Sequence, residues 1–212
     1  MEIFEFGNLE SDIVLIQVVG DHDAGMAEKV AAEISRLSGI DFKMAAFKVK
    51  DWNQELSPWE APPVFGNEGF GAGAAKTLKE IEKYCNDSSK TYIIGGYSLA
   101  GLFALWAGFT SETFAGVAAA SPSMWFPGFD TYMKERKIAA QAVYLSLGDK
   151  EEKTKNPVMN TVGDKMRDAH KLLSDRGVNC IYEVNPGNHF AEPDVRVAKA
   201  FAWVLAKLKK AD

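Results

Sequence analysis

One serine of the chain stands among small residues where a strand-like run gives way to a helical pattern. The segment Gly96–Gly101 reads GYSLAG, and a helix is predicted over Leu99 to Phe109. In a nucleophile elbow, a sharp strand-to-helix turn projects a serine above the sheet, and the crowded positions two before and two after it need small residues. Gly96 and Ala100 occupy these positions. The sequence therefore predicts that Ser98 is a nucleophile, although an ordinary glycine-rich turn could have the same composition.

Such a serine needs a base, and the base needs an acid to orient it. His189 lies in the turn-rich segment NPGNHF, residues 185–190, after the last predicted strand. Open α/β sheets place their functional loops at the carboxyl ends of the strands, so His189 is the predicted base. His170 lies among charged residues in a predicted helix, where we expect it to be solvated. The acid is expected between serine and histidine in the chain, where strand Val143–Leu147 is followed by three carboxylates, those of Asp149, Glu151 and Glu152.

Attack on a carbonyl also requires two backbone N–H groups that stabilise the oxyanion. The amide of Leu99, directly after the serine, is expected to supply one of them. The loop after the predicted strand Ile13–Val19 should supply the other, and the amide of Asp21 is the best candidate. The run Asp21-His22-Asp23 could instead hold a metal ion, but no second cluster of ligands matches it, so no metal is predicted.

Further residues are expected to contact a substrate. Residues 51–73 have no clear period, and so long an irregular segment is usually functional or disordered. Its aromatic side chains favour an ordered segment, as a pocket wall or as a small core beneath the loop. The segment Ser123–Phe126 follows another strand and is a second possible pocket wall. The predicted substrate-binding residues are His22, Trp52, Trp59, Tyr97 and Trp125.

The elements that must position these residues alternate along the chain. Apolar runs predict strands over Ile13–Val19, Phe42–Val49, Tyr92–Ile94, Phe114–Ala119, Val143–Leu147 and Val178–Val184. Helical periodicity predicts one helix after Asp23 and further helices over Ala74–Tyr84, Leu99–Phe109, Val158–Leu173 and Val195–Leu208. Strands that alternate with helices predict βαβ units and a mostly parallel sheet with helices on both faces. Residues 1–212 are thus predicted to form a single α/β domain.

Composition and charge exclude several classes of protein. The chain has 212 residues, 47% hydrophobic and 25% charged, which is typical of one globular domain. Its net charge of −5 provides no basic face for phosphates, so nucleic acid is not an expected partner. The uncharged stretch Thr91–Ser111 contains several glycines and Ser98, and we expect a buried strand and helix there rather than a membrane span.

The predicted location follows from two weaker signals. The acidic N-terminal segment MEIFEFGNLE has neither the basic nor the apolar region of a signal peptide. The two cysteines, Cys85 and Cys180, are far apart and form no CxxC pair. We therefore expect a cytoplasmic protein without a disulfide framework.

The whole chain resembles the serine hydrolases of the α/β-hydrolase fold, and among them the esterases of the esterase D and siderophore-esterase type. The matching segments occur in the expected order and are Gly20–His22, Gly96–Gly101, Ala120–Trp125, Gly148–Glu152 and Gly187–Phe190. In these esterases the acid commonly lies three residues after the glycine that ends its strand, which implies Glu151, with Asp149 as the alternative. The His-Gly-Gly-Gly oxyanion motif of lipases is absent from the sequence.

These observations lead to one main functional hypothesis. The chain is expected to be a serine carboxylic-ester hydrolase that acts on a small-molecule ester through Ser98, Glu151 and His189, with no cofactor. No gap between predicted elements is long enough for a separate lid domain. An acyltransferase or a small-peptide hydrolase would use the same residues, and a non-catalytic binding module on this fold is a further alternative. Neither the ester nor the oligomeric state follows from the sequence.

Overall fold

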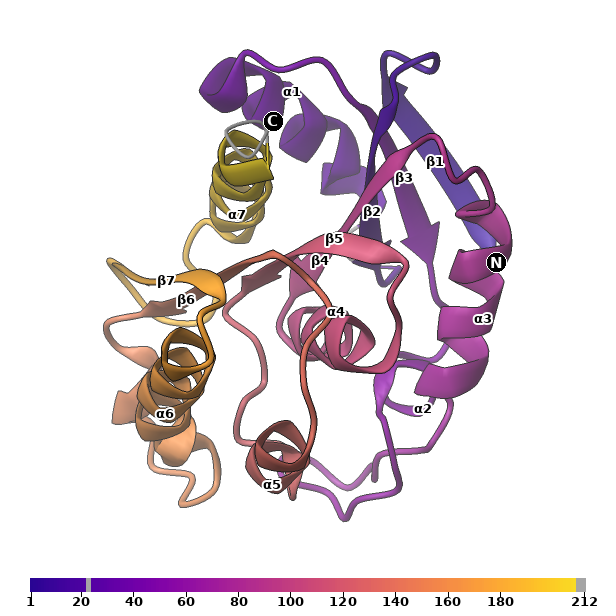
Figure 1. The fold of residues 1–212 in the computed structure, drawn as a ribbon. Coiled ribbons are helices and arrows are strands. Elements are labelled where there is room, and N and C mark those ends of the chain that lie inside the picture. The colour runs from indigo at the N-terminus through magenta and orange to yellow at the C-terminus, as the bar shows by residue number, and fades with distance from the viewer. Residues whose placement is uncertain (22–23, 209–212) are drawn as a thin grey trace.

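A seven-stranded sheet forms the centre of the protein in a computed structural model, which describes residues 1–21 and 24–208. The strands lie in the order β1-β3-β2-β4-β5-β6-β7 (Figure 1). Their bounds are β1 Glu2–Gly7, β2 Ile13–Val19, β3 Lys43–Lys48, β4 Thr91–Tyr97, β5 Phe114–Ala120, β6 Ala142–Gly148 and β7 Asn179–Asn185. All neighbouring pairs are parallel except β1 with β3. The prediction of a mostly parallel α/β sheet is confirmed.

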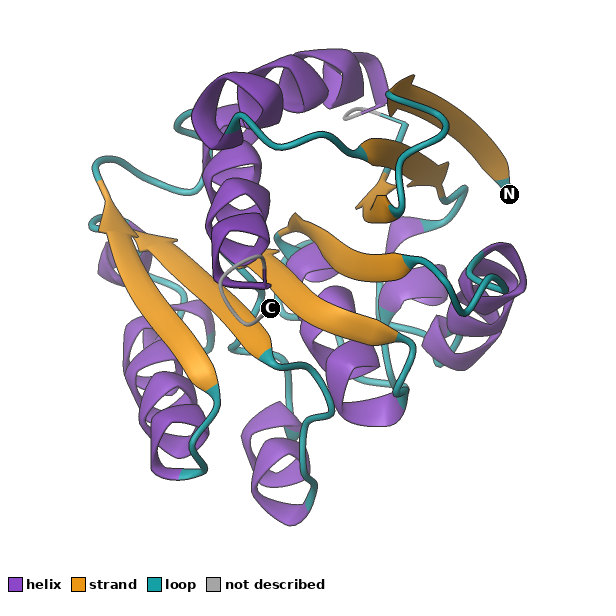
Figure 2. Ribbon diagram, turned by 45° about the horizontal axis from the view of Figure 1, so that its top comes forward, coloured by secondary structure: helices purple, strands orange, loops and turns teal. Residues whose placement is uncertain are grey.

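Helices cover both faces of this sheet (Figure 2). Their bounds are α1 Ala27–Ser38, α2 Trp52–Leu56, α3 Ala74–Tyr84, α4 Leu99–Thr110, α5 Phe129–Glu135, α6 Val162–Asp175 and α7 Pro193–Leu208. The apolar sides of α1 and α7 pack with β-strand residues such as Leu15 and Ile93 on one face. The helices α2 to α6 contribute to the core on the other face, around side chains such as Ile16 and Ile94. Within the described residues, no separate lid domain is inserted between these elements.

The burial of the central strands explains their sequence. Strands covered on both faces read as continuous apolar runs rather than as alternating patterns, and every residue from Val14 to Val19 is buried. Helix α4 is apolar on all sides because it is buried all round, from Leu99 to Phe109. The uncharged stretch of residues 91–111 is thus a strand followed by a buried helix, as predicted. Among the described parts of the chain, no helix combines the length and the apolar character that a membrane crossing needs.

Among the strands and α-helices, β1, α2 and α5 were not predicted, and others differ at their ends. Strand β1 is an edge strand with a mixed, half-exposed pattern, and α5 has only seven residues. Strand β4 continues through Gly95 and Gly96 to Tyr97, beyond the predicted end at Ile94. The helix predicted from Val158 begins as a 3₁₀ turn, Met159–Thr161, and becomes α-helical at Val162. The irregular segment 51–73 is ordered around α2 and a bridge between Ala61 and Phe70.

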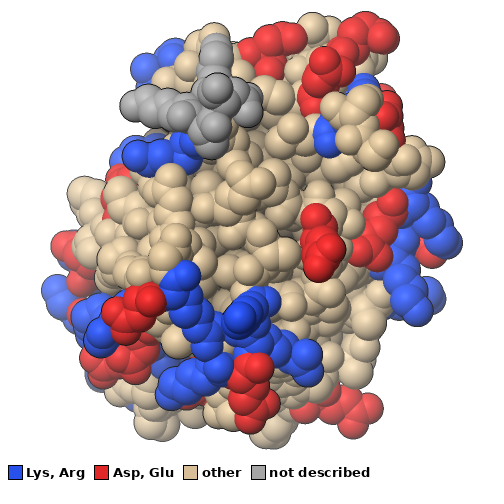
Figure 3. Space-filling view, in the orientation of Figure 1, with Lys and Arg blue, Asp and Glu red and all other residues tan. Residues whose placement is uncertain are grey.

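Charges of both signs are distributed over the face shown in Figure 3. Lysine and arginine side chains gather in the lower part of this view, with acidic side chains between and beside them. Several ion pairs are local pairs on helices, such as Arg36 with Glu33 and Lys171 with Asp175. Exposed pairs of this kind contribute little to stability, so the fold depends chiefly on its apolar layers.

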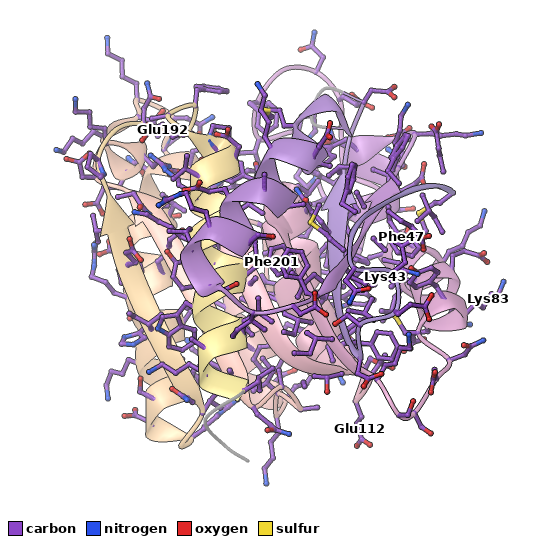
Figure 4. All side chains as sticks on the ribbon, turned by 90° about the horizontal axis from the view of Figure 1, so that it is seen from above. Lys43, Phe47, Lys83, Glu112, Glu192 and Phe201 are labelled. Carbon is purple, nitrogen blue, oxygen red and sulfur yellow. The ribbon has the colours of Figure 1, made fainter. Side chains whose placement is uncertain are left out.

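Helix α7 packs closely against strands β4 and β5 at Gly95. In Figure 4, Phe201 of α7 is labelled near the centre of the molecule, and Glu192, just before α7, near its edge. A Cβ atom on Gly95 would lie 2.6 Å from Phe201 Cζ and 2.7 Å from the carbonyl oxygen of Ala118. Because the strand and the helix are both buried, neither can move away freely.

We therefore expect Gly95→Ala to lower the free energy of unfolding by about 1–3 kcal/mol through overpacking. Urea unfolding followed by circular dichroism measures this change. Gly25→Ala is the matched control, since a Cβ at Gly25 meets no atom within 4 Å. Equal stabilities of the two variants would contradict the tight packing of α7 on β4.

Candidate active site

Ser98 occupies a sharp turn between β4 and α4. Its backbone has φ 58° and ψ −122°, in a region that residues other than glycine seldom adopt. The turn needs Gly96, because a Cβ there would lie 2.7 Å from Ala100 Cβ. The Ser98 N–H donates to the carbonyl of Ala120 at 3.2 Å. These features give Ser98 the geometry of a nucleophile elbow.

Three side chains from distant parts of the sequence meet at this turn. His189 Nε2 lies 3.0 Å from Ser98 Oγ, and His189 Nδ1 lies 2.6 Å from Glu151 Oε2. The histidine is in the loop between β7 and α7, and Glu151 begins a 3₁₀ turn, Glu151–Lys153, after β6. The imidazole therefore bridges a hydroxyl and a carboxylate, which is the arrangement that activates a serine in acyl transfer.

Glu151 is held by several donors besides the histidine. Its Oε1 accepts from the Gly148 N–H at 2.7 Å, from Ser121 Oγ at 2.8 Å and from Arg196 Nη1 at 2.9 Å. Burial raises the pKa of Glu151, but the hydrogen bonds from His189, Gly148 and Ser121 outweigh it, and the net pKa is below its ordinary value. The carboxyl group is therefore ionised at neutral pH, as an orienting acid requires.

The other two candidate acids point elsewhere. Asp149 Oδ1 accepts from the N–H of Gly187 at 2.7 Å, and Glu152 Oε2 pairs with Arg167 Nη2 at 3.0 Å. Of these three carboxylates, Glu151 is the one whose side chain contacts the ring of His189. The side chains of Asp149 and Glu152 leave the end of β6 in other directions.

A cavity of about 920 Å³ opens beside Ser98 and His189. Its lining is mostly apolar and aromatic, with Lys50, Asp51, Glu68 and Glu151 as charged members. The aromatic lining residues are Trp52, Phe65, Tyr97, Trp125 and Phe190. Phe190 is 85% exposed and packs edge-on against the ring of His189, with the two ring centroids 5.7 Å apart. A volume of this size suits a small molecule with an apolar or aromatic part.

Some of the residues predicted to bind substrate line the cavity, and others do not. Trp52, Tyr97 and Trp125 line the cavity, although Trp125 is only 7% exposed rather than a surface aromatic. Trp59 does not line it: its Nε1 donates to the carbonyl of Pro127, and its ring packs with Phe126. Trp59 therefore fits the alternative expectation for this segment, an aromatic side chain packed in a small core beneath the loop.

The two predicted oxyanion donors, Leu99 and Asp21, lie in different surroundings. Leu99 is the first residue of α4, directly after Ser98. The side chain of Asp21 is 75% exposed and forms an ion pair with Lys48 at 2.6 Å, and Asp21 is not among the described residues that line the cavity. His22 lies outside the described residues. Among those that are described, no group of three or more His, Cys, Asp or Glu side chains could hold a metal ion.

Two contributors to the site were not found from the sequence. Ser121 directly follows β5 and has φ 42°, and its hydroxyl donates to Glu151. Arg196 is buried within α7, at 2% exposure, and reaches the same carboxylate. The helical spacing could have pointed to Arg196, because it shares a face with the buried residues Ala200 and Val204.

Comparison with solved structures bears on the fold. An IroE-like serine hydrolase from Shewanella oneidensis has a TM-score of 0.75 at 16% identity, covering 95% of this chain and 74% of that chain. The chain has the α/β-hydrolase fold. The siderophore hydrolase EstA from Aspergillus nidulans has the same fold, with a TM-score of 0.70 at 18% identity over 95% of this chain and 85% of that chain.

A third α/β-hydrolase is longer than this chain. The enterobactin esterase FES from Shigella flexneri has a TM-score of 0.68 at 13% identity, covering 97% of this chain and 55% of that chain. The present chain thus spans about half the length of that esterase. No protein-family model matches the sequence, and a sequence search of the curated proteins finds no match. The likeness to these α/β-hydrolases therefore lies in the fold, at identities below 20%.

Glu151 should make the stability of this α/β-hydrolase fold depend on pH. Because its pKa is lower in the folded chain than its ordinary value of 4.5, the ionised carboxylate stabilises the fold above that pH. This stabilisation is lost as the pH falls through the folded pKa. We expect Glu151→Gln to cost about 3 kcal/mol at pH 7, since it leaves the Arg196 cation buried without its partner. The difference from wild type should shrink as the pH falls through the folded pKa of Glu151.

Denaturant unfolding of both proteins, at a series of pH values from 7 downwards, measures the difference. Glu152→Gln is the neighbouring control: its ion pair with Arg167 is at the surface, so its effect should be small throughout. A difference for Glu151→Gln that stays constant with pH would contradict the role given to the ionised carboxylate.

Proposed function

We propose that the chain is a serine hydrolase that cleaves a carboxylic ester through an acyl-enzyme on Ser98. The observation that carries this proposal is the continuous chain of contacts from Ser98 Oγ through the His189 ring to Glu151, at 3.0 and 2.6 Å, beside a cavity of about 920 Å³. A binding module would have no use for a hydroxyl, an imidazole and a buried carboxylate in this order.

In the first half of the proposed reaction, His189 Nε2 takes the proton of Ser98 Oγ as the oxygen attacks the ester carbonyl carbon. Glu151 accepts the hydrogen bond from Nδ1 and stabilises the imidazolium that forms. The negative charge moves to the carbonyl oxygen, for which we assign the backbone amides of Leu99 and Asp21 as donors. The ester C–O bond then breaks, and His189 returns its proton to the leaving alcohol.

In the second half, water replaces the alcohol. His189 takes a proton from the water as its oxygen attacks the acyl carbon on Ser98, and returns this proton to Ser98 Oγ when the bond to the serine breaks. The products are the free acid and the regenerated serine, so one ester and one water give one acid and one alcohol. Every proton is moved by His189, and no cofactor takes part.

The cavity supports an ester with a bulky apolar or aromatic part. Trp52, Phe65 and Trp125 form aromatic walls, and the apolar side chains of Met159 and Val162 complete them. Two similar structures are described as a siderophore hydrolase and an enterobactin esterase. Flat aromatic groups pack well against such walls. An aryl or long acyl ester is therefore the proposed substrate class, in preference to an acetyl ester.

Ser98 can be tested with a fluorophosphonate probe, which reacts covalently with activated serines. We expect wild-type protein to take up one probe per chain and Ser98→Ala to take up none, because Ser98 is the serine whose Oγ lies against His189 Nε2. Intact-mass spectrometry counts the label. Ser123→Ala is the matched control, since Ser123 Oγ lies 3.4 Å from Ser98 Oγ and should not itself be labelled. Wild-type protein that stays unlabelled would overturn the proposed function.

The aromatic wall can be tested by comparing two p-nitrophenyl esters, one with an acetyl and one with a longer acyl chain. Trp52→Ala should raise KM for the long-chain ester about tenfold, the effect of about 1.4 kcal/mol of lost apolar contact, and change the acetyl ester far less. Trp203→Ala is the control, because Trp203 packs with Tyr144 on the other face of the sheet. A parallel loss on both esters would contradict a role for Trp52 in selectivity.

A further inference from the structure

Arg196 is a buried cation whose contacts reach two separate parts of the site. It lies in the first turn of α7, and its side chain is 2% exposed. Within the described part of the chain, it forms one ion pair, with Glu151 at 2.9 Å. A charged group so far from water is retained only where its donors are satisfied, so each contact of the guanidinium group matters for what it does.

On one side, the guanidinium group fixes the carboxylate. Arg196 Nη1 lies 2.9 Å from Glu151 Oε1 and 3.2 Å from Ser121 Oγ. Together with the Gly148 N–H, these groups occupy Oε1 and leave Oε2 to the ring of His189. The contact thereby decides which carboxylate oxygen faces the imidazole.

On the other side, the same group holds the loop that carries the histidine. Arg196 Nη2 donates to the carbonyl of Pro186 at 3.0 Å and to that of Asn188 at 3.1 Å. Arg196 Nη1 also lies 3.1 Å from the hydroxyl of Tyr97, which in turn donates to the carbonyl of His189 at 2.7 Å. Three carbonyls of the loop are thus tied to Arg196, directly or through Tyr97.

We propose that Arg196 is a positioning residue, which holds the acid and the loop of the base in one fixed relation. This inference rests on the proposed function, because it assigns Arg196 an effect through Glu151 and His189 and no contact with substrate. A planar guanidinium group can donate in two directions at once, whereas an ammonium group is a single point of charge. Lysine at this position would keep the charge and lose one of the two sets of contacts.

Lys199 provides a comparison within the same helix. It is one turn further along α7 and ties the helix to β7, since its Nζ lies 3.1 Å from both Glu183 Oε1 and Asn185 Oδ1. Neither of these two contacts involves Ser98, Glu151 or His189. Loss of Lys199 therefore reports what a weaker anchor of α7 does to the enzyme, without the two contacts assigned to Arg196.

The test compares Arg196→Lys and Arg196→Met with Lys199→Met. For each folded variant, kcat and KM are measured on a p-nitrophenyl ester well below its unfolding temperature. We expect both Arg196 variants to lose about 100-fold in kcat, the effect of a displacement of about 1 Å, with KM changed less than about twofold. Lys199→Met should keep kcat within about twofold of wild type.

A second readout follows the geometry itself. The proton in the 2.6 Å contact between His189 Nδ1 and Glu151 Oε2 should give a far-downfield NMR resonance. This resonance should shift or disappear in Arg196→Lys and remain in Lys199→Met. If Arg196→Met does not fold, Arg196→Lys decides, because it keeps a positive charge opposite Glu151.

The outcomes separate the two proposals. A folded Arg196→Lys with wild-type kcat and an unchanged resonance would overturn the inference alone, as would an equal loss of kcat in Lys199→Met. A wild-type protein that neither hydrolyses the ester nor reacts with the fluorophosphonate probe would overturn the proposed function, and the inference with it.

Discussion

The backbone of Ser98 is the constraint on which the rest of the site depends. A non-glycine residue at φ 58° costs about 1–3 kcal/mol and persists only where its surroundings hold it. Here the Ser98 N–H donates to Ala120, and its carbonyl accepts from the N–H groups of Leu102 and Ser123. Both polar groups of the strained residue are thus used, one by β5 and the other by α4 and the segment after β5. The hydroxyl projects above the sheet because the turn cannot relax.

The order of the strands explains how the remaining groups reach this hydroxyl. Strands β4, β5, β6 and β7 are consecutive neighbours, and all four are parallel. Their carboxyl ends therefore lie along one edge of the sheet, about 4.8 Å apart from strand to strand. Each end contributes one group: Ser98 after β4, Ser121 after β5, Glu151 after β6 and His189 in the loop after β7. Residues up to 91 positions apart in sequence are thereby within hydrogen-bond reach.

This regularity is also why much of the architecture could be predicted from the sequence. Buried parallel strands appear as apolar runs, so six strands and the positions of Ser98 and His189 after them were predictable. Strand β1 was not, because at the edge of the sheet it mixes Glu2 and Glu5 with partly buried aromatics and has no apolar run. Helix α5 is too short to show a period. The end of β4 was missed because Gly95 and Gly96 have no strand preference, yet pair with β2 and β5 on both sides.

The contacts that a side chain makes cannot be predicted from such patterns, as Arg196 illustrates. Its spacing from Ala200 and Val204 places it on the buried face of α7, but the helical pattern does not show that its guanidinium group reaches Glu151. Stability does not explain this burial, because removing two charges from water costs several kcal/mol, and an apolar pair of equal volume is often as stable. An apolar side chain in place of Arg196 could not donate hydrogen bonds to Glu151 Oε1 or to the carbonyls of the loop that carries His189. In the proposed mechanism, what the ion pair supplies, and apolar packing cannot, is the orientation of Glu151 and His189 towards Ser98.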